Sequence, residues 1–111
     1  MTIDELATLL GGKVFVEGKK DRAVTKATVG DLLSFIMGTA EEGAVWVTIQ
    51  SHLNVAAVAV LKEIPMIIIA SGREPAADLM ARCETEGITL VTVQESIFDT
   101  CSKMAELGIV G

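Results

Sequence analysis

The sequence contains few of the residues from which most catalytic and metal sites are built. Among 111 residues there are one histidine, two cysteines, one tryptophan and no tyrosine. Zinc sites use about four ligands, mostly cysteine and histidine, and here Cys83 and Cys101 have only His52 to join them. We therefore expect no metal site and no cofactor, and we interpret both cysteines as structural free thiols. A catalytic triad would have to be built around His52 alone, which argues against an enzyme.

Motifs that bind nucleotides or carry a catalytic serine are also missing. Gly11-Gly12-Lys13 resembles the end of a P-loop, but that motif needs a glycine where this chain has Ala7 and a hydroxyl residue where it has Val14. No two glycines are separated by a single residue, so the dinucleotide fingerprint G-x-G-x-x-G cannot occur. A G-x-S-x-G nucleophile elbow is absent as well. We expect neither kinase nor hydrolase activity.

Charge and hydropathy limit the range of partners. No apolar run approaches the ~18 residues that cross a bilayer, and the first residues, Met1–Glu5, are acidic where a signal peptide would be basic. We expect a cytoplasmic protein without membrane contact. The net charge of −6 repels phosphate backbones, so we expect no nucleic-acid partner. Apolar residues make up 50% and the mean hydropathy is +0.52, which indicates either an unusually apolar surface or a partner that covers part of it.

Residues 44–100 repeat a strand, a turn and a helix three times, a pattern typical of parallel sheets with crossover helices. The strand-like runs are apolar and β-branched, as in strands buried on both faces; they are Ala44–Ile49, Met66–Ala70 and Ile88–Val93. Two earlier runs, Lys13–Glu17 and Ala23–Val29, predict further strands. We expect one domain over residues 1–111 with an α/β layered fold, in which a mostly parallel sheet of about four or five strands is flanked by about four or five helices.

One predicted helix, from Leu53 to Lys62, has no polar side chain between Val55 and Leu61. A helix that is apolar all round must be covered all round. One face can pack on the sheet, and the other needs a second element or a second subunit. We therefore expect a homodimer, with Val55, Val58 and Ala59 as the candidate interface residues.

Loops at the carboxyl ends of parallel strands are where α/β proteins usually hold ligands. In the loop after the second run, Gly72 permits a positive φ, Pro75 suits the first turn of the next helix, and Arg73 is a cation for a phosphate or carboxylate. The alternative is that this loop is an ordinary turn that starts a helix and binds no ligand. The full set of candidate ligand-binding residues at this edge is Ser51 (also an expected N-cap), His52, Ser71, Gly72, Arg73, Asp99 and Thr100.

Three stretches of the chain resemble the DRTGG domain family. Gly43–Thr48 resembles its strand of a glycine, an apolar run and a threonine, and Met66–Pro75 resembles its apolar strand that ends in Thr-Gly-Gly with a proline soon after. Phe98-Asp99-Thr100 resembles its aromatic-Asp-Thr signature. Two positions depart from the family pattern. Ser51-His52 stands near the place of the Asp-Arg pair, and Ser71-Gly72-Arg73 replaces Thr-Gly-Gly.

The resemblance implies a fold similar to the N-terminal domain of HPr kinase/phosphorylase. DRTGG domains occur in the regulatory regions of CBS-domain pyrophosphatases, ahead of phosphate acetyltransferase domains, and as small stand-alone proteins. The implied function is a non-catalytic regulatory or interaction domain, homodimeric, that binds a partner protein. The alternative is a sensor for a small anionic ligand, either an adenine nucleotide or a phosphate-bearing metabolite. A small enzyme is the third hypothesis and the least favoured.

Overall fold

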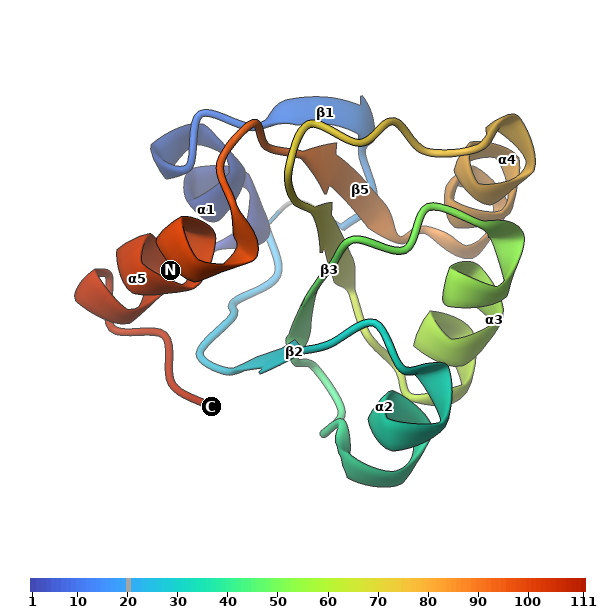
Figure 1. Ribbon diagram of the computed structural model, residues 1–111, viewed down its shortest axis with the longest axis horizontal. Helices are drawn as coiled ribbons and strands as arrows, with labels where there is room; N and C mark the ends of the chain where they lie inside the picture. The colour runs from blue at the N-terminus through green and yellow to red at the C-terminus, as the bar shows by residue number, and fades with distance from the viewer. Residues whose placement is uncertain (20) are drawn as a thin grey trace.

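A five-stranded sheet lies between two layers of helices in the computed structural model, which describes residues 1–19 and 21–111 (Figure 1). The strand order is β1-β5-β4-β3-β2. The strands are β1 (Lys13–Val16), β2 (Ala27–Val29), β3 (Val45–Thr48), β4 (Met66–Ile69) and β5 (Thr89–Thr92). The helices are α1 (Ile3–Leu9), α2 (Leu33–Thr39), α3 (Leu53–Leu61), α4 (Ala77–Glu86) and α5 (Ile97–Glu106).

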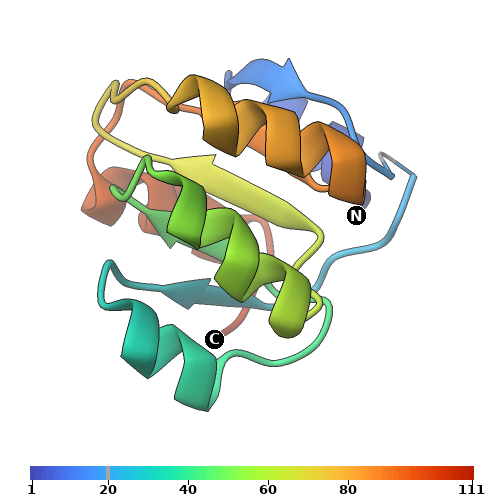
Figure 2. The same ribbon diagram turned by 90° about the vertical axis from the view of Figure 1, so that its right-hand side faces the viewer.

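The sheet is parallel from β2 to β5, and only β1 pairs antiparallel, with β5. Every residue of β3, β4 and β5 is buried, because helices cover both faces. Helices α2, α3 and α4 lie side by side on one face (Figure 2), where Trp46, Ile67 and Leu90 belong to the core. Helices α1 and α5 cover the other face, over Val47 and Ile68. The predicted α/β layered fold with a mostly parallel sheet is therefore confirmed.

The predicted element boundaries differ most at β2. The sequence predicts a strand over Ala23–Val29, but only Ala27–Val29 pairs with β3. Ala23 instead forms an isolated antiparallel bridge with Thr2, at the start of α1. Val24, Thr25 and Lys26 connect this bridge to β2. The Thr2–Glu5 side-chain and backbone bonds form a complete capping box at that helix start.

The three residues expected at a subunit contact lie inside the protomer. Val55 and Ala59 are almost fully buried and Val58 is 8% exposed, all within the core on the α3 side of the sheet. Helices α2 and α4 flank α3 in the same layer, so they cover the sides of α3 that the sheet does not reach (Figure 2). Val55, Val58 and Ala59 are therefore core residues of the protomer and are not part of its exposed surface. The large apolar side chains that α3 exposes are Leu53 and Leu61.

The single tryptophan joins β3 to the segment that follows β2. Trp46 is fully buried, and its Nε1–H donates a 2.9 Å hydrogen bond to the Gly30 carbonyl oxygen. A buried indole N–H without a partner would be costly, so this bond fixes the chain where it leaves the sheet edge.

No helix in the described part of the chain is both long and apolar enough to cross a membrane.

Two turns that are distant in sequence touch through backbone atoms. A Cβ on Gly18, just after β1, would overlap the backbone carbonyl of Gly87, which caps α4 with φ +72°. The Gly18 N–H donates a 3.0 Å hydrogen bond to the Thr89 hydroxyl. Only glycine fits between these groups, so Gly18 fixes the loop that follows β1 against the turn between α4 and β5.

We predict that Gly18→Ala lowers the free energy of unfolding by about 1–3 kcal/mol, because the new methyl group meets backbone that cannot rotate away. The matched control is Gly38→Ala in α2, where an added Cβ has no heavy atom within 4 Å. There alanine should raise the free energy of unfolding by about 0.5–1 kcal/mol through lower chain entropy. Urea denaturation measures both, and equal effects would contradict the Gly18–Gly87 constraint.

Candidate functional site

The loops after β3, β4 and β5 meet at one edge of the sheet, as the sequence predicts. Backbone hydrogen bonds join them directly. The Ala76 N–H donates to the Ser51 carbonyl oxygen at 2.9 Å, and the Ser71 N–H donates to that of Glu95 at 2.7 Å. The Gly72 N–H donates to the Val93 carbonyl oxygen at 2.9 Å. The three loops therefore form one continuous surface at the carboxyl ends of the parallel strands.

These same bonds change the expected role of the loop after β4. The sequence predicts an anion site in this loop, but the N–H groups of Ser71 and Gly72 are already used between loops. Ser71 and Gly72 both have positive φ, +63° and +67°. A Cβ on Gly72 would lie 2.8 Å from the Gln94 side-chain oxygen, so the glycine allows close packing of the neighbouring loop. Pro75 precedes the helix and does not occupy its first turn, because Ala76 is the N-cap.

The other candidate residues separate into buried and exposed groups. Ser51 is 8% exposed and is not the N-cap of α3, which is His52. Thr100 is fully buried, and its hydroxyl donates a 2.8 Å hydrogen bond to the Ser96 carbonyl oxygen. The Ser96 hydroxyl caps α5 by accepting from the Asp99 N–H at 3.1 Å. His52, Ser71, Arg73 and Asp99 remain exposed and accessible to a ligand.

The starts of α3 and α4 form a feature that the sequence reasoning missed. Neither N-cap residue, His52 or Ala76, makes a side-chain capping bond, so the N–H groups of both first turns lack a side-chain acceptor. An open hollow of about 570 Å³ lies between the two helices. It is lined by His52, Leu53, Asn54, Ala57, Ala76, Asp78 and Arg82. The sequence feature that could have revealed these uncapped helix starts is the absence of Ser, Thr, Asp or Asn from both N-cap positions.

The charges at this edge are mixed. The Lys103 ammonium lies 2.9 Å from Glu95 Oε2, an ion pair without hydrogen-bond alignment. Arg73 is exposed and makes no ion pair with any of the residues that the structure describes. Asp99 adds a negative charge in the first turn of α5. An anion at this edge would gain from Arg73 and the helix starts, while the carboxylates would weaken its binding.

The cysteines have the environment of structural thiols. Cys83 is fully buried and burial raises its pKa to about 11. Burial also raises the pKa of Cys101, which is partly exposed. A reactive cysteine requires the opposite shift, towards the thiolate. In the ranges 1–19 and 21–111, no group of three or more His, Cys, Asp or Glu side chains is placed to hold a metal ion.

Comparison with known proteins gives a family and a fold. The sequence profile of the DRTGG domain matches residues 5–107. A similar solved structure is that of the CBS and DRTGG domains of the regulatory region of Clostridium perfringens pyrophosphatase, complexed with its activator diadenosine tetraphosphate. The TM-score is 0.76 at 15% sequence identity, and the match covers 93% of this chain but only 45% of that chain. No curated protein matches the sequence significantly.

We predict that Ellman's reagent modifies Cys101 faster than Cys83, and that Cys83 reacts only as the protein unfolds. The raised pKa of Cys83 also affects stability. An unfolded chain loses this proton near pH 9.0 and the folded chain near pH 11, so stability should fall as the pH rises through that window. Cys83→Ala should remove this part of the pH dependence. Rapid labelling of Cys83 in the folded protein would contradict the structural assignment.

Proposed function

The chain belongs to the DRTGG domain family, and from this premise we propose that residues 1–111 form a single non-catalytic regulatory domain that acts as a cytoplasmic homodimer. The family assignment over residues 5–107 supports a regulatory role. The missing P-loop and the protonated thiols support a non-catalytic one. The proposal of a dimer rests on an uncovered apolar surface beside β2.

This surface, the β2–α2 patch, consists of Val29, Leu32 and Phe35. Their exposed fractions are 41%, 64% and 56%. Val29 ends β2, Leu32 is the N-cap of α2, and Phe35 lies in the first turn of that helix. Val29 and Phe35 line the same hollow of about 420 Å³. The sequence predicts an apolar helix here, yet only Ile36 of α2 is fully buried. Three large apolar side chains close together in a small domain mark an interaction surface.

A second copy of the chain is the occupant that this position favours. Strand β2 is outermost in the sheet, and among the described residues the backbone bridge on its outer side joins Lys26, just before β2, to Val110. The Ala27 N–H donates a 2.8 Å hydrogen bond to the Val110 carbonyl oxygen, whereas Val29 makes no such contact. Most homo-oligomers are two-fold dimers in which the same patch meets itself. In such a dimer, the apolar patch of one copy packs against the same patch of the second copy.

We predict that Phe35→Glu weakens the dimer at least about ten-fold, because a carboxylate would be buried in the contact. The matched control is Leu9→Glu, since Leu9 is 54% exposed on α1, on the opposite face of the sheet. Light scattering should give twice the 11.7 kDa chain mass for the parent and the control, and a lower mass for Phe35→Glu. A parent protein that stays monomeric at tens of micromolar would refute the dimer.

The second candidate function is the sensing of an adenine nucleotide. The structurally similar pyrophosphatase region was solved with diadenosine tetraphosphate, and the present chain has two uncapped helix starts beside a hollow. Phosphate groups bind well at such helix starts. The nearby cations are Arg73 and Arg82, although Arg82 already pairs with Glu86 at 3.0 Å. The candidate contacts are therefore His52 and Arg73, and Asp78, which lines the hollow in the first turn of α4, opposes an anion.

We predict that ATP or diadenosine tetraphosphate shifts the amide resonances of Leu53, Asn54, Gly72 and Arg73 in an NMR titration. Arg73→Met should weaken this binding about ten-fold, since it removes the charge-assisted contact. Lys62→Met serves as the control, because Lys62 is the C-cap of α3 and lies at the other end of that helix from His52. No shift at about 5 mM nucleotide, a saturating concentration for a millimolar site, would remove the nucleotide hypothesis and leave the dimer proposal intact.

A further inference from the structure

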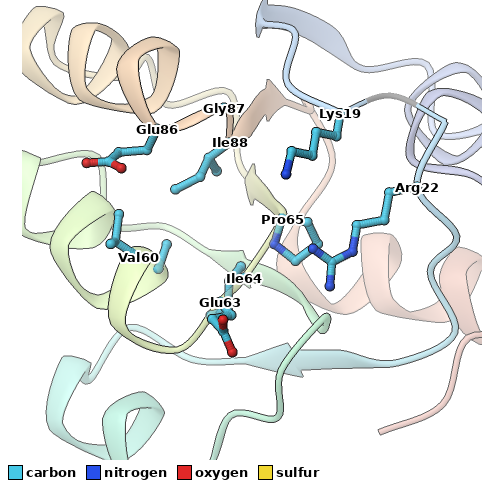
Figure 3. A pocket seen from close by; sticks show the side chains of 10 residues that line it. Lys19, Arg22, Val60, Glu63, Ile64, Pro65, Glu86, Gly87 and Ile88 are labelled. Atoms are coloured by element: carbon cyan, nitrogen blue, oxygen red, sulfur yellow. The ribbon is translucent and has the colours of Figure 1, made fainter.

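Another hollow lies at the opposite end of the sheet from the loops that follow β3, β4 and β5. Its volume is about 240 Å³, and it lies between the loop after β1, the turn from α3 to β4 and the turn from α4 to β5 (Figure 3). An apolar floor is formed by Ala59, Val60, Ile64, Pro65 and Ile88. Charged side chains stand around this floor: Lys19, Arg22, Glu63 and Glu86.

Two cations point into this hollow from one turn. Figure 3 shows the Lys19 and Arg22 side chains extending toward the space beside Pro65. The Arg22 N–H donates a 3.1 Å hydrogen bond to the Lys19 carbonyl oxygen. The contact of Gly18 with Gly87 holds this turn at one end, and the 2.9 Å bond from the Ile3 N–H to the Arg22 carbonyl oxygen holds it at the other. The backbone contacts of Gly18 and Arg22 therefore place Lys19 and Arg22 beside the hollow.

Neither cation has a carboxylate partner within the described ranges. The ion pairs there use Lys26, Arg82 and Lys103. Arg22 is nevertheless partly buried, with its guanidinium against Gly43, where an added Cβ would lie 3.2 Å from Nη2. Partly buried charges are normally paired, because removal from water is otherwise costly. In a chain of net charge −6, an unpaired, partly buried guanidinium in a hollow indicates an anionic group of a ligand.

The other wall of the hollow is negative. Glu63 lines it with φ +54°, a strained value for a residue other than glycine, and makes no ion pair with the described residues. Glu86 is already engaged by Arg82. Helices α3 and α4 both end here, with C-caps at Lys62 and Gly87. Helix C-termini favour cations and oppose a second anionic group. A phosphate dianion or a nucleotide is thus poorly matched to this hollow.

We propose that this hollow binds a small zwitterion with an apolar body, namely a free α-amino acid. Its carboxylate contacts Lys19 and Arg22, its ammonium group contacts Glu63 and the C-terminal end of α3, and its side chain rests on Val60 and the neighbouring floor. The volume corresponds to about eight water molecules, which suits an amino acid of the size of leucine. This site is separate from the dimer patch and from the nucleotide edge, so its test is independent of both.

The test is an NMR titration of the full chain with L-leucine and with two half-ligands, 4-methylpentanoate (leucine without its ammonium group) and isopentylamine (leucine without its carboxylate). Leucine should shift the amides of Lys19, Arg22, Glu63 and Gly87, and each half-ligand should bind about ten-fold more weakly. If 4-methylpentanoate binds as tightly as leucine, the zwitterion assignment is overturned. No shift of these amides at about 10 mM leucine would overturn the site itself, because that concentration saturates a millimolar site.

Substitutions test the cationic wall and the anionic wall of the hollow separately. Arg22→Met and Lys19→Met should each weaken leucine binding about ten-fold, and Glu63→Gln should weaken the binding of leucine and isopentylamine while leaving that of 4-methylpentanoate unchanged. Arg73→Met, at the opposite edge, is the matched control and should bind leucine like the parent. Thermal melts verify that each variant is folded, and Lys19→Met keeps the test valid if Arg22→Met unfolds. Unchanged leucine affinity in both Lys19→Met and Glu63→Gln would refute the proposal.

Discussion

The burial of β3, β4 and β5 on both faces is the constraint on which the rest of the molecule depends. Strands without a polar face require helices on each side, and parallel strands require a crossover helix between each pair. The chain meets both conditions with α2, α3 and α4 on one face and α1 and α5 on the other. As a result, no side chain of the central strands reaches solvent. Surfaces for recognition are therefore formed by the two ends of the sheet, its outer strands and the helices.

The two ends of the sheet differ in physical character. At the carboxyl end, Ser71, Gly72 and Ala76 donate their N–H groups to neighbouring loops, so the loops hold one another in place. The donors left for a ligand belong to helix starts. At the amino end, helices α3 and α4 terminate, and the loop after β1 brings two cations close to these negative helix ends. A domain of this size therefore offers two sites of opposite electrostatic preference.

Periodicity and turn chemistry in the sequence predicted the sheet and the helices, since these depend on residues close together in the chain. What could not be predicted came from contacts between distant segments. Val55, Val58 and Ala59 follow an apolar pattern that fits either a subunit contact or a helix between two others, and the presence of α2 and α4 decides it. The hollow beside Arg22 depends on Gly18 meeting Gly87, which no local pattern reveals. The expected likeness to the N-terminal domain of HPr kinase/phosphorylase stays a prediction.

The buried Trp46 gives this protein a built-in optical reporter. With one tryptophan and no tyrosine in the chain, nearly all its near-ultraviolet fluorescence comes from this single side chain. The indole is shielded from water and held by the Gly30 carbonyl oxygen, so its emission should lie at short wavelength in the folded state. Gly30 directly follows β2, the strand that carries part of the β2–α2 patch. Events that loosen this edge strand will therefore be visible as a red shift, without any label.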